Sequence, residues 1–162
     1  MPVYFAYGAN MDRSAMARRC PASKPLMPGR LMNHRFIVTS DGFASVRREQ
    51  GAVVHGLLWD LALKDVCPLD RFEEVGKGLY TRVMQPIVKA GGAHRAMVYV
   101  GKSVERGNPQ PGYMESVVAS AEHCGLPDSY LLELRQWLPQ LPSQALERVP
   151  SVRPRFATPF DR

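Results

Sequence analysis

The sequence feature that most restricts the fold lies at the N-terminus, where an apolar, aromatic run stops abruptly in a turn. Residues 4–7 read Tyr-Phe-Ala-Tyr, and Gly-Ala-Asn follows at residues 8–10. Asp12 then stands as an N-cap at the start of a helix-like segment, residues 12–19. The pattern predicts a buried strand that ends in a tight turn and passes directly to a helix N-terminus.

This turn is a candidate anion site. Gly8 permits a positive φ and lets a ligand come close to the backbone, and we expect the N–H groups of the turn to be unpaired and to point outward. Such N–H groups suit a carboxylate or a developing oxyanion. An ordinary connection between a strand and a helix uses the same turn residues, so the turn alone leaves both interpretations open.

Strand-like and helix-like patterns alternate along the first three-quarters of the chain without a linker. The strand-like segments are residues 26–31, 34–38, 44–47, 53–61, 79–88 and 95–100, and the last two are expected to form a hairpin around Gly91-Gly92. The helix-like segments are residues 63–72, 111–124 and 127–138. Pro68 leaves open whether the first of these is one helix or two short pieces. Strands paired by hairpins and mixed with helices predict an α+β fold.

The length of 162 residues fits one domain with a sizeable core. Residues 139–162 hold five of the fourteen prolines and several arginines. We therefore expect a domain over residues 1–138 and an extended Pro/Arg-rich arm over residues 139–162, as part of the same single domain.

The net charge of +6 raises the question of a nucleic-acid partner. The basic residues are scattered, with short doublets at Arg18-Arg19 and Arg47-Arg48, whereas a nucleic-acid module gathers them on one face with interleaved aromatics. A surface that attracts small anions is the better interpretation. No apolar run reaches membrane-spanning length and no secretory signal is recognisable, so the prediction is a cytoplasmic protein without a membrane partner.

The three cysteines, Cys20, Cys67 and Cys124, lie far apart in the sequence. An odd count without C-x-x-C spacing argues against a disulfide framework and against a zinc site. We expect three buried free thiols and no metal site.

Three segments of the chain resemble the gamma-glutamylcyclotransferase family, the AIG2-like proteins. Residues 7–10, Tyr-Gly-Ala-Asn, are similar to the family's Tyr-Gly-Ser-Asn loop, and residues 69–80 are similar to its Leu-Asp-x-x-Glu-Gly-Val-x-x-Gly-x-Tyr segment. The third segment is Pro-Gly-Tyr at residues 111–113, followed by a helical stretch and Gly-Leu-Pro at 125–127. The resemblance extends over about residues 2–138. Two departures are Ala9, where the family has Ser, and Glu74, where it has Gly after the catalytic Glu.

The resemblance implies a small, mixed β-barrel-like sheet with surrounding helices. It also implies an enzyme without a cofactor, which cyclises a small γ-glutamyl amide or peptide to 5-oxoproline and releases the amine or amino acid. Glu73 would be the general acid/base, whether the reaction is classed with the transferases or with the lyases. A partly apolar pocket around Glu73 would raise its pKa to a useful value, although a solvent-facing carboxylate at a helix end is the alternative.

The other site residues follow from the same comparison. Backbone N–H groups around residues 7–10 (Tyr7, Gly8, Ala9, Asn10) would hold the substrate's α-carboxylate, and Tyr113 would either donate a hydrogen bond to the γ-glutamyl group or serve only in packing. Glu74 is the rival base, and Glu74, Tyr80 and Arg82 are candidates for lining the pocket. The leaving-group side would be built from loops such as residues 41–43 and 102–109.

Two further interpretations stay open at this point. The departures at Ala9 and Glu74 are compatible with a non-catalytic protein that binds small carboxylates on the same fold. A basic interaction module, with the arm from Pro139 contacting nucleic acid, is the third. The sequence does not indicate an oligomeric state.

Overall fold

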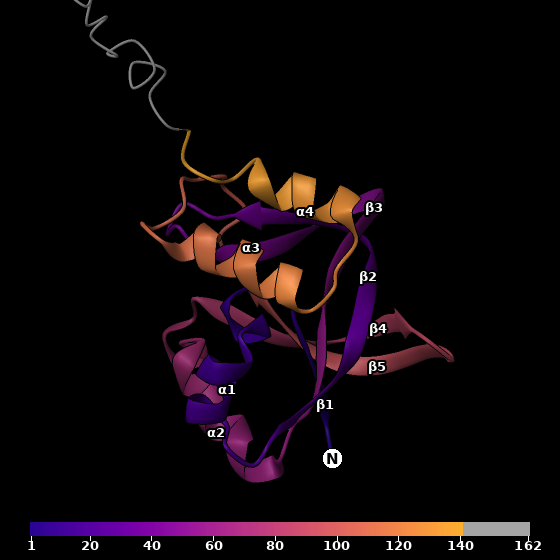
Figure 1. The fold of residues 1–162 in the computed structure, drawn as a ribbon. Helices are drawn as coiled ribbons and strands as arrows, with labels where there is room; N and C mark the ends of the chain where they lie inside the picture. Colours follow the sequence, from indigo (N-terminus) through magenta and orange to yellow (C-terminus); the bar gives the residue numbers. More distant parts are fainter. Residues whose placement is uncertain (141–162) are drawn as a thin grey trace, which may run out of the picture.

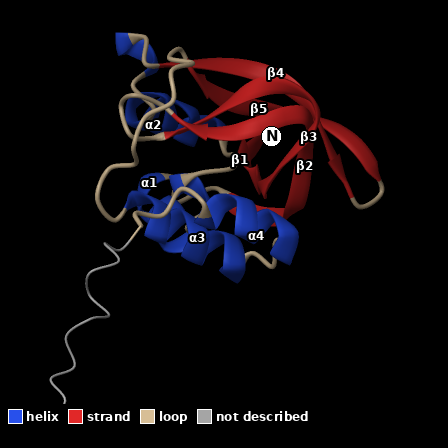
Figure 2. Ribbon diagram, turned by 90° about the horizontal axis from the view of Figure 1, so that it is seen from above, coloured by secondary structure: helices blue, strands red, loops and turns tan. Residues whose placement is uncertain are grey.

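The computed structural model describes residues 1–140, which form a closed five-stranded barrel with helices on one side of it (Figures 1 and 2). The strands are β1 (Val3–Ala6), β2 (Lys24–Val38), β3 (Ala44–Asp60), β4 (Tyr80–Lys89) and β5 (Gly92–Gly101). The α-helices in these residues are α1 (Arg13–Arg19), α2 (Leu63–Phe72), α3 (Tyr113–His123) and α4 (Asp128–Arg135). Two short 3-10 turns are η1 (Ala9–Met11) and η2 (Val75–Lys77). The predicted α+β class, with a barrel-like sheet and surrounding helices, is confirmed.

Strand β1 closes the barrel. The strand order is β1-β3-β2-β4-β5, and β1 pairs antiparallel with β3 from Val3↔Asp60 to Ala6↔Leu57. On its other side β1 runs parallel to β5, with Tyr4 opposite Met97. Because β1 joins the two ends of the sheet, the turn that follows it is held by both neighbours.

The structure joins segments that the sequence pattern separates. Predicted strands 26–31 and 34–38 are parts of the single strand β2, and 44–47 and 53–61 are parts of β3. Between Met32 and His34 the register shifts, Asn33 takes φ 56°, and its side-chain oxygen accepts a hydrogen bond from the Gly51 N–H at 3.0 Å. The apolar alternation breaks at this bulge, although the strand pairing continues past it.

Helix α2 runs unbroken through Pro68, which settles the question left open by the sequence. Pro68 lies in the middle of the helix, where its missing N–H removes one intrahelical hydrogen bond. In the first turn of α2 the buried carboxylate of Asp65 accepts hydrogen bonds from the Ala22 N–H at 2.9 Å and the Ser23 hydroxyl at 2.8 Å. These bonds tie α2 to the segment after α1 and fix the helix whose far end carries Glu73.

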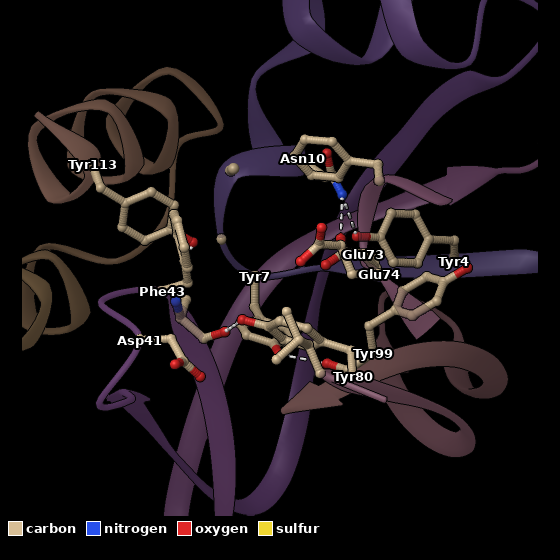
Figure 3. A pocket seen from close by; sticks show the side chains of 15 residues that line it. Tyr4, Tyr7, Asn10, Asp41, Phe43, Glu73, Glu74, Tyr80, Tyr99 and Tyr113 are labelled. Atoms are coloured by element: carbon tan, nitrogen blue, oxygen red, sulfur yellow. Dashed lines mark hydrogen bonds between the residues drawn. The ribbon is translucent and has the colours of Figure 1, made fainter. Parts of the chain in front are cut away.

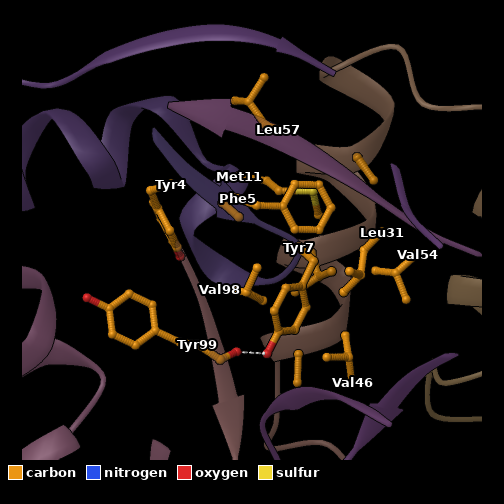
Figure 4. Close-up of a cluster of buried hydrophobic side chains, with 14 of the residues drawn as sticks. Tyr4, Phe5, Tyr7, Met11, Leu31, Val46, Val54, Leu57, Val98 and Tyr99 are labelled. Atoms are coloured by element: carbon orange, nitrogen blue, oxygen red, sulfur yellow. Dashed lines mark hydrogen bonds between the residues drawn. The ribbon is translucent and has the colours of Figure 1, made fainter. Parts of the chain in front are cut away.

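The core is built from the inward side chains of the strands and from the helices that cover them (Figure 4). The Tyr7 hydroxyl donates a hydrogen bond of 2.5 Å to the Tyr99 carbonyl, which links the residue after β1 to β5 across the interior.

The Asp12 carboxylate accepts hydrogen bonds from the N–H groups of Ser14 at 2.8 Å and Ala15 at 3.0 Å. The predicted N-cap of α1 is thus confirmed.

The prediction of three buried thiols is wrong for one cysteine. Cys20 is buried and Cys124 half-buried, but Cys67 is exposed because it lies on the outer face of α2.

Of the predicted C-terminal arm, residues 141–162 lie outside the described residues. Among the helices in residues 1–140, none has the length and apolar character needed to cross a membrane.

Replacing Gly56 with alanine should destabilise the barrel, because β1 passes directly against this position of β3. A Cβ at Gly56 would collide with the Ala6 carbonyl and lie 2.8 Å from the Phe5 ring. We expect a loss of about 3 kcal/mol in the free energy of unfolding, measured by urea denaturation. Gly76→Ala is the matched control, because a Cβ there meets nothing within 4 Å. Equal stability of the two variants would contradict this account.

Candidate active site

A pocket of about 630 Å³ lies where the turn after β1, the end of α2 and the start of α3 meet (Figure 3). Six segments of the chain, between Tyr4 and Tyr113, contribute to it. The residues that line it are Tyr4, Tyr7, Gly8, Ala9, Asn10, Asp41, Phe43, Ala44, Phe72, Glu73, Glu74, Leu79, Tyr80, Tyr99 and Tyr113.

The pocket has a buried floor and an exposed mouth. Tyr4, Tyr7 and Asn10 are almost fully buried, with Asn10 only 3% exposed. Large apolar side chains at the mouth remain in contact with solvent, and Phe43 is 43% exposed. A ligand can therefore enter from the mouth and place a polar group against the floor.

Glu73 is placed by the end of α2. It is the C-cap of the helix, and its N–H donates to the Leu69 carbonyl at 2.9 Å. Glu74, the next residue, takes the left-handed conformation with φ 51°, which turns the chain away from the helix axis. The Asn10 amide nitrogen donates to the Glu73 carboxylate at 2.7 Å and to the Tyr4 hydroxyl at 3.0 Å (Figure 3). Two of the predicted motifs, 63 positions apart, thus meet in one hydrogen bond.

Arg19, at the end of α1, orients Asn10. Its guanidinium donates to the side-chain oxygen of Asn10 and lies over the Phe72 ring, with 3.4 Å between the Arg19 Cζ and the ring centroid. Because the amide oxygen of Asn10 faces this cation, the amide nitrogen faces Glu73. The sequence analysis assigned no role to Arg19, although it lies only nine residues after Asn10.

The environment of Glu73 suits proton transfer near neutral pH. Burial raises the pKa of the Glu73 carboxyl from 4.5 to about 7, although the Arg19 charge and the Asn10 hydrogen bond act in the opposite direction. The location at the C-terminal end of a helix also disfavours a negative charge. A carboxyl with this pKa can take up a proton and return it at little free-energy cost.

Glycine is needed at position 8 because a side chain there would be too close to neighbouring residues, and not because of its φ angle. The expected positive φ is wrong, because Gly8 has φ −124°. A Cβ there would lie 3.0 Å from the Tyr113 hydroxyl and 3.1 Å from the Ala44 Cβ. After Gly8 the turn η1 begins, closed by the Met11 N–H on the Gly8 carbonyl at 3.1 Å. The first N–H groups of such a turn have no acceptor within the turn itself, so they can serve a ligand.

Tyr113 and Tyr80 hold the opposite wall. The Tyr113 hydroxyl accepts a hydrogen bond from the Ala44 N–H at 3.2 Å, and the Tyr80 hydroxyl donates to the Ala44 carbonyl at 2.6 Å. The Tyr113 ring packs edge-on against Phe43, with 5.3 Å between ring centroids. Tyr113 therefore lines the pocket and also packs against Phe43, and its hydrogen bond to a γ-glutamyl group stays a prediction.

Glu74 and Arg82, the remaining candidates for lining the pocket, differ because only Glu74 borders it. Glu74 lines the pocket, and its carboxylate forms an exposed ion pair of 2.6 Å with Lys77. Arg82 is not among the lining residues in the described chain. Its guanidinium binds Asp70 at 2.9 Å, and Asp70 accepts a second hydrogen bond, of 2.6 Å, from the Tyr99 hydroxyl.

The structure adds pocket residues that the sequence analysis left without a role, notably Tyr4, Tyr99, Phe72 and Leu79. The first two lie in strands, where an aromatic residue is ordinarily read as core. Of the two loops expected on the leaving-group side, residues 41–43 contribute Asp41 and Phe43, and no residue of 102–109 lines the pocket. In residues 1–140, no three His, Cys, Asp or Glu side chains are grouped to hold a metal ion.

The chain thus combines a closed barrel with a protonatable carboxyl set against the loop after its first strand. The chain belongs to the AIG2-like family, whose model matches residues 53–134. The gamma-glutamylcyclotransferases of mouse and human are each 24% identical to it over 144 residues, which cover 82% of this chain and 77% of theirs.

Solved structures agree with this assignment at the level of the fold. A structure described as a gamma-glutamyl cyclotransferase superposes with a TM-score of 0.80 and 23% identity, covering 88% of this chain and 90% of the other. A human protein described as uncharacterized has a TM-score of 0.79 and 24% identity, with 85% and 88% covered.

Replacing Glu73 with glutamine should stabilise the protein at neutral and higher pH. Since the folded-state pKa lies above 4.5, ionising Glu73 costs the folded state more than the unfolded state, and stability is lost as the pH rises from about 4.5 to about 7. Glutamine has no such cost, so the gain should be near zero at pH 4 and on the order of 3 kcal/mol above pH 7, measured by urea unfolding. Glu74→Gln, at an exposed ion pair, is the control. A gain in the free energy of unfolding that is the same at every pH would contradict the raised pKa of Glu73.

Proposed function

We propose that this chain is a gamma-glutamylcyclotransferase-type enzyme, which cyclises a γ-glutamyl amide or peptide to 5-oxoproline and releases the amine or amino acid. The observation that carries the proposal is the Glu73 carboxyl, with its pKa raised to about 7, hydrogen-bonded to the loop of residues 7–10 in one pocket. Membership of the AIG2-like family and the named mammalian relatives support it.

The proposed reaction is an intramolecular aminolysis. Glu73, as a carboxylate, accepts a proton from the α-ammonium of the substrate, and the free amine attacks its own γ-carbonyl carbon. A new C–N bond closes a five-membered ring and leaves a tetrahedral oxyanion. When this intermediate collapses, the original amide C–N bond breaks as Glu73 returns the proton to the leaving nitrogen. The ring nitrogen then gives its second proton to the regenerated Glu73 carboxylate, which passes it to the released amine, so that a neutral lactam and an ammonium group are formed. No cofactor takes part, because nucleophile and electrophile belong to one small molecule.

The remaining residues bind and orient. N–H groups of Gly8, Ala9 and Asn10 hold the α-carboxylate, and Ala9 supplies its N–H although it lacks the family's hydroxyl. Asn10 has a second role, since its side chain holds the Glu73 carboxylate in place. The proposal keeps the cytoplasmic location and the absence of a nucleic-acid partner that the sequence predicts.

Release of 5-oxoproline from γ-glutamyl dipeptides and γ-glutamyl-amines is the direct test. Glu73→Gln should lower kcat by ~10² to 10⁴, because it removes the proton carrier and keeps the shape of the side chain. Glu74→Gln is the matched control and should retain most of the activity. If the wild-type chain binds these compounds and releases no 5-oxoproline, the chain is a carboxylate-binding protein instead. A dead Glu74→Gln beside an active Glu73→Gln would move the assignment by one residue.

The role of the loop predicts selectivity for a free α-carboxylate. Substrates whose α-carboxyl is amidated should lose at least about tenfold in kcat/KM, since a charge-assisted contact is lost. Gly8→Val should raise KM for the free acid, because its side chain would press on Tyr113 and Ala44 at the loop. Ala9→Ser is the control and should be tolerated. Equal turnover of the amide and the acid would show that the loop does not hold the carboxylate.

A further inference from the structure

We propose that the mouth of the pocket selects γ-glutamyl compounds whose leaving amine carries a second, positively charged group, such as a mono-γ-glutamylated diamine. The inference rests on the proposed function, which it deepens by naming the class of leaving group. It is carried by the charges and the apolar surface at the mouth.

The leaving group must extend toward the mouth. The reacting γ-glutamyl half lies against Glu73 and the loop of residues 8–10, where Asn10 is 3% exposed. The amine bound to the γ-carbonyl then points away from this floor. The exposed or half-buried lining residues include Asp41 and Phe43, which lie together, and Glu74, which lies beside Glu73 (Figure 3).

The ionisable charged side chains of the lining, apart from tyrosines, are all acidic. They are Asp41, Glu73 and Glu74, and no Lys, Arg or His in the described chain lines the pocket. Of the cations near the pocket, Arg19 contacts Asn10 and Phe72, and Lys77 pairs with Glu74. Lys102 lies outside the lining, with its Nζ beside Gly78. A leaving amino acid would bring its carboxylate among lining side chains that carry no positive charge, which disfavours its binding.

Asp41 is the best placed of the three to meet a cation. Within residues 1–140 its carboxylate forms no ion pair and accepts no hydrogen bond, whereas its carbonyl accepts from the Gln110 side chain at 3.0 Å. The neighbouring Gly42 N–H donates to the Thr39 carbonyl at 2.9 Å, and Gly42 in turn accepts from the Gln110 N–H at 3.0 Å. The turn is thus held by its backbone, and the acidic side chain is left available.

Apolar side chains line the path between the floor and these carboxylates. Phe43 and Phe72 are each 43% exposed and Leu79 is 41% exposed, although all three line the pocket. A short chain of methylene groups would cover such surface and gain from its removal from water. An alkyl chain that ends in an ammonium group therefore matches both the walls and the charge of the mouth.

The test uses three ligands of similar length. They are the γ-glutamyl amides of 1,4-diaminobutane (cationic end), n-pentylamine (neutral end) and 4-aminobutyrate (anionic end). Binding is measured by calorimetry at low ionic strength on Glu73→Gln, which prevents turnover and carries no charge at that position. Because Glu74 is paired with Lys77, any charge preference that remains is expected to come from Asp41. The cationic ligand should bind ~5-fold more tightly than the neutral one, and the anionic ligand ~5-fold more weakly.

A second substitution tests which residue causes the preference for the cationic ligand. Adding Asp41→Asn should bring the cationic-to-neutral affinity ratio close to one, whereas adding Glu105→Gln, the same charge change at an exposed residue outside the lining, should leave the ratio unchanged. Affinities equal within about twofold, tightest binding of the anionic ligand, or no binding of any of the three would overturn the inference.

Turnover separates this inference from the proposed function. The wild-type chain should release 5-oxoproline with the same order of kcat/KM, cationic first. Release from all three without a charge order leaves the proposed function standing and the inference refuted. Charge-ordered binding without any 5-oxoproline refutes the proposed function and leaves the selectivity of the mouth established.

Discussion

The closure of the barrel by β1 is the constraint on which the rest of the molecule depends. Its four residues pair with β3 on one side and Tyr4 pairs with Met97 of β5 on the other, so the loop after β1 leaves the barrel at a defined point. The hydrogen bond from Tyr7 to the Tyr99 carbonyl adds a link across the interior. Asp65 ties α2 to the segment that follows α1, so the end of α2 is held near the loop and Glu73 meets Asn10.

The site balances opposing influences on one carboxyl. Arg19 and Asn10 both favour the ionised form of Glu73, and burial favours the neutral form more strongly, so the pKa is raised to about 7. A stronger cation contact would hold the carboxylate ionised and make it a poor base. Without the opposing effects of Arg19 and Asn10, burial would raise the pKa of Glu73 further. The hydrogen bond that places Glu73 therefore also adjusts how readily it gains and loses a proton.

Local signals predicted the parts of the fold that depend on local chemistry. The Asp12 cap, the hairpin at Gly91-Gly92 and the place of Glu73 at a helix end follow from turn and capping preferences that act over a few residues. The continuity of β2 past Asn33 depends on a partner strand, and the exposure of Cys67 depends on which face of α2 is covered. Neither feature is determined by the residues next to it in the sequence. The same holds for Arg19, whose partners come from a loop and from another helix.

The left-handed backbone at Glu74 has a consequence for how related chains can diverge. The chain must turn there to leave α2, so the family's glycine suits the conformation, and glutamate adopts it at a cost of about 1 kcal/mol. The turn is made by the backbone, and the side chain only borders the mouth of the pocket. Substitutions at this position can alter what the mouth accepts while the carboxyl of Glu73 stays where it is. Under the proposed function, selectivity and chemistry thus occupy adjacent residues that can evolve separately.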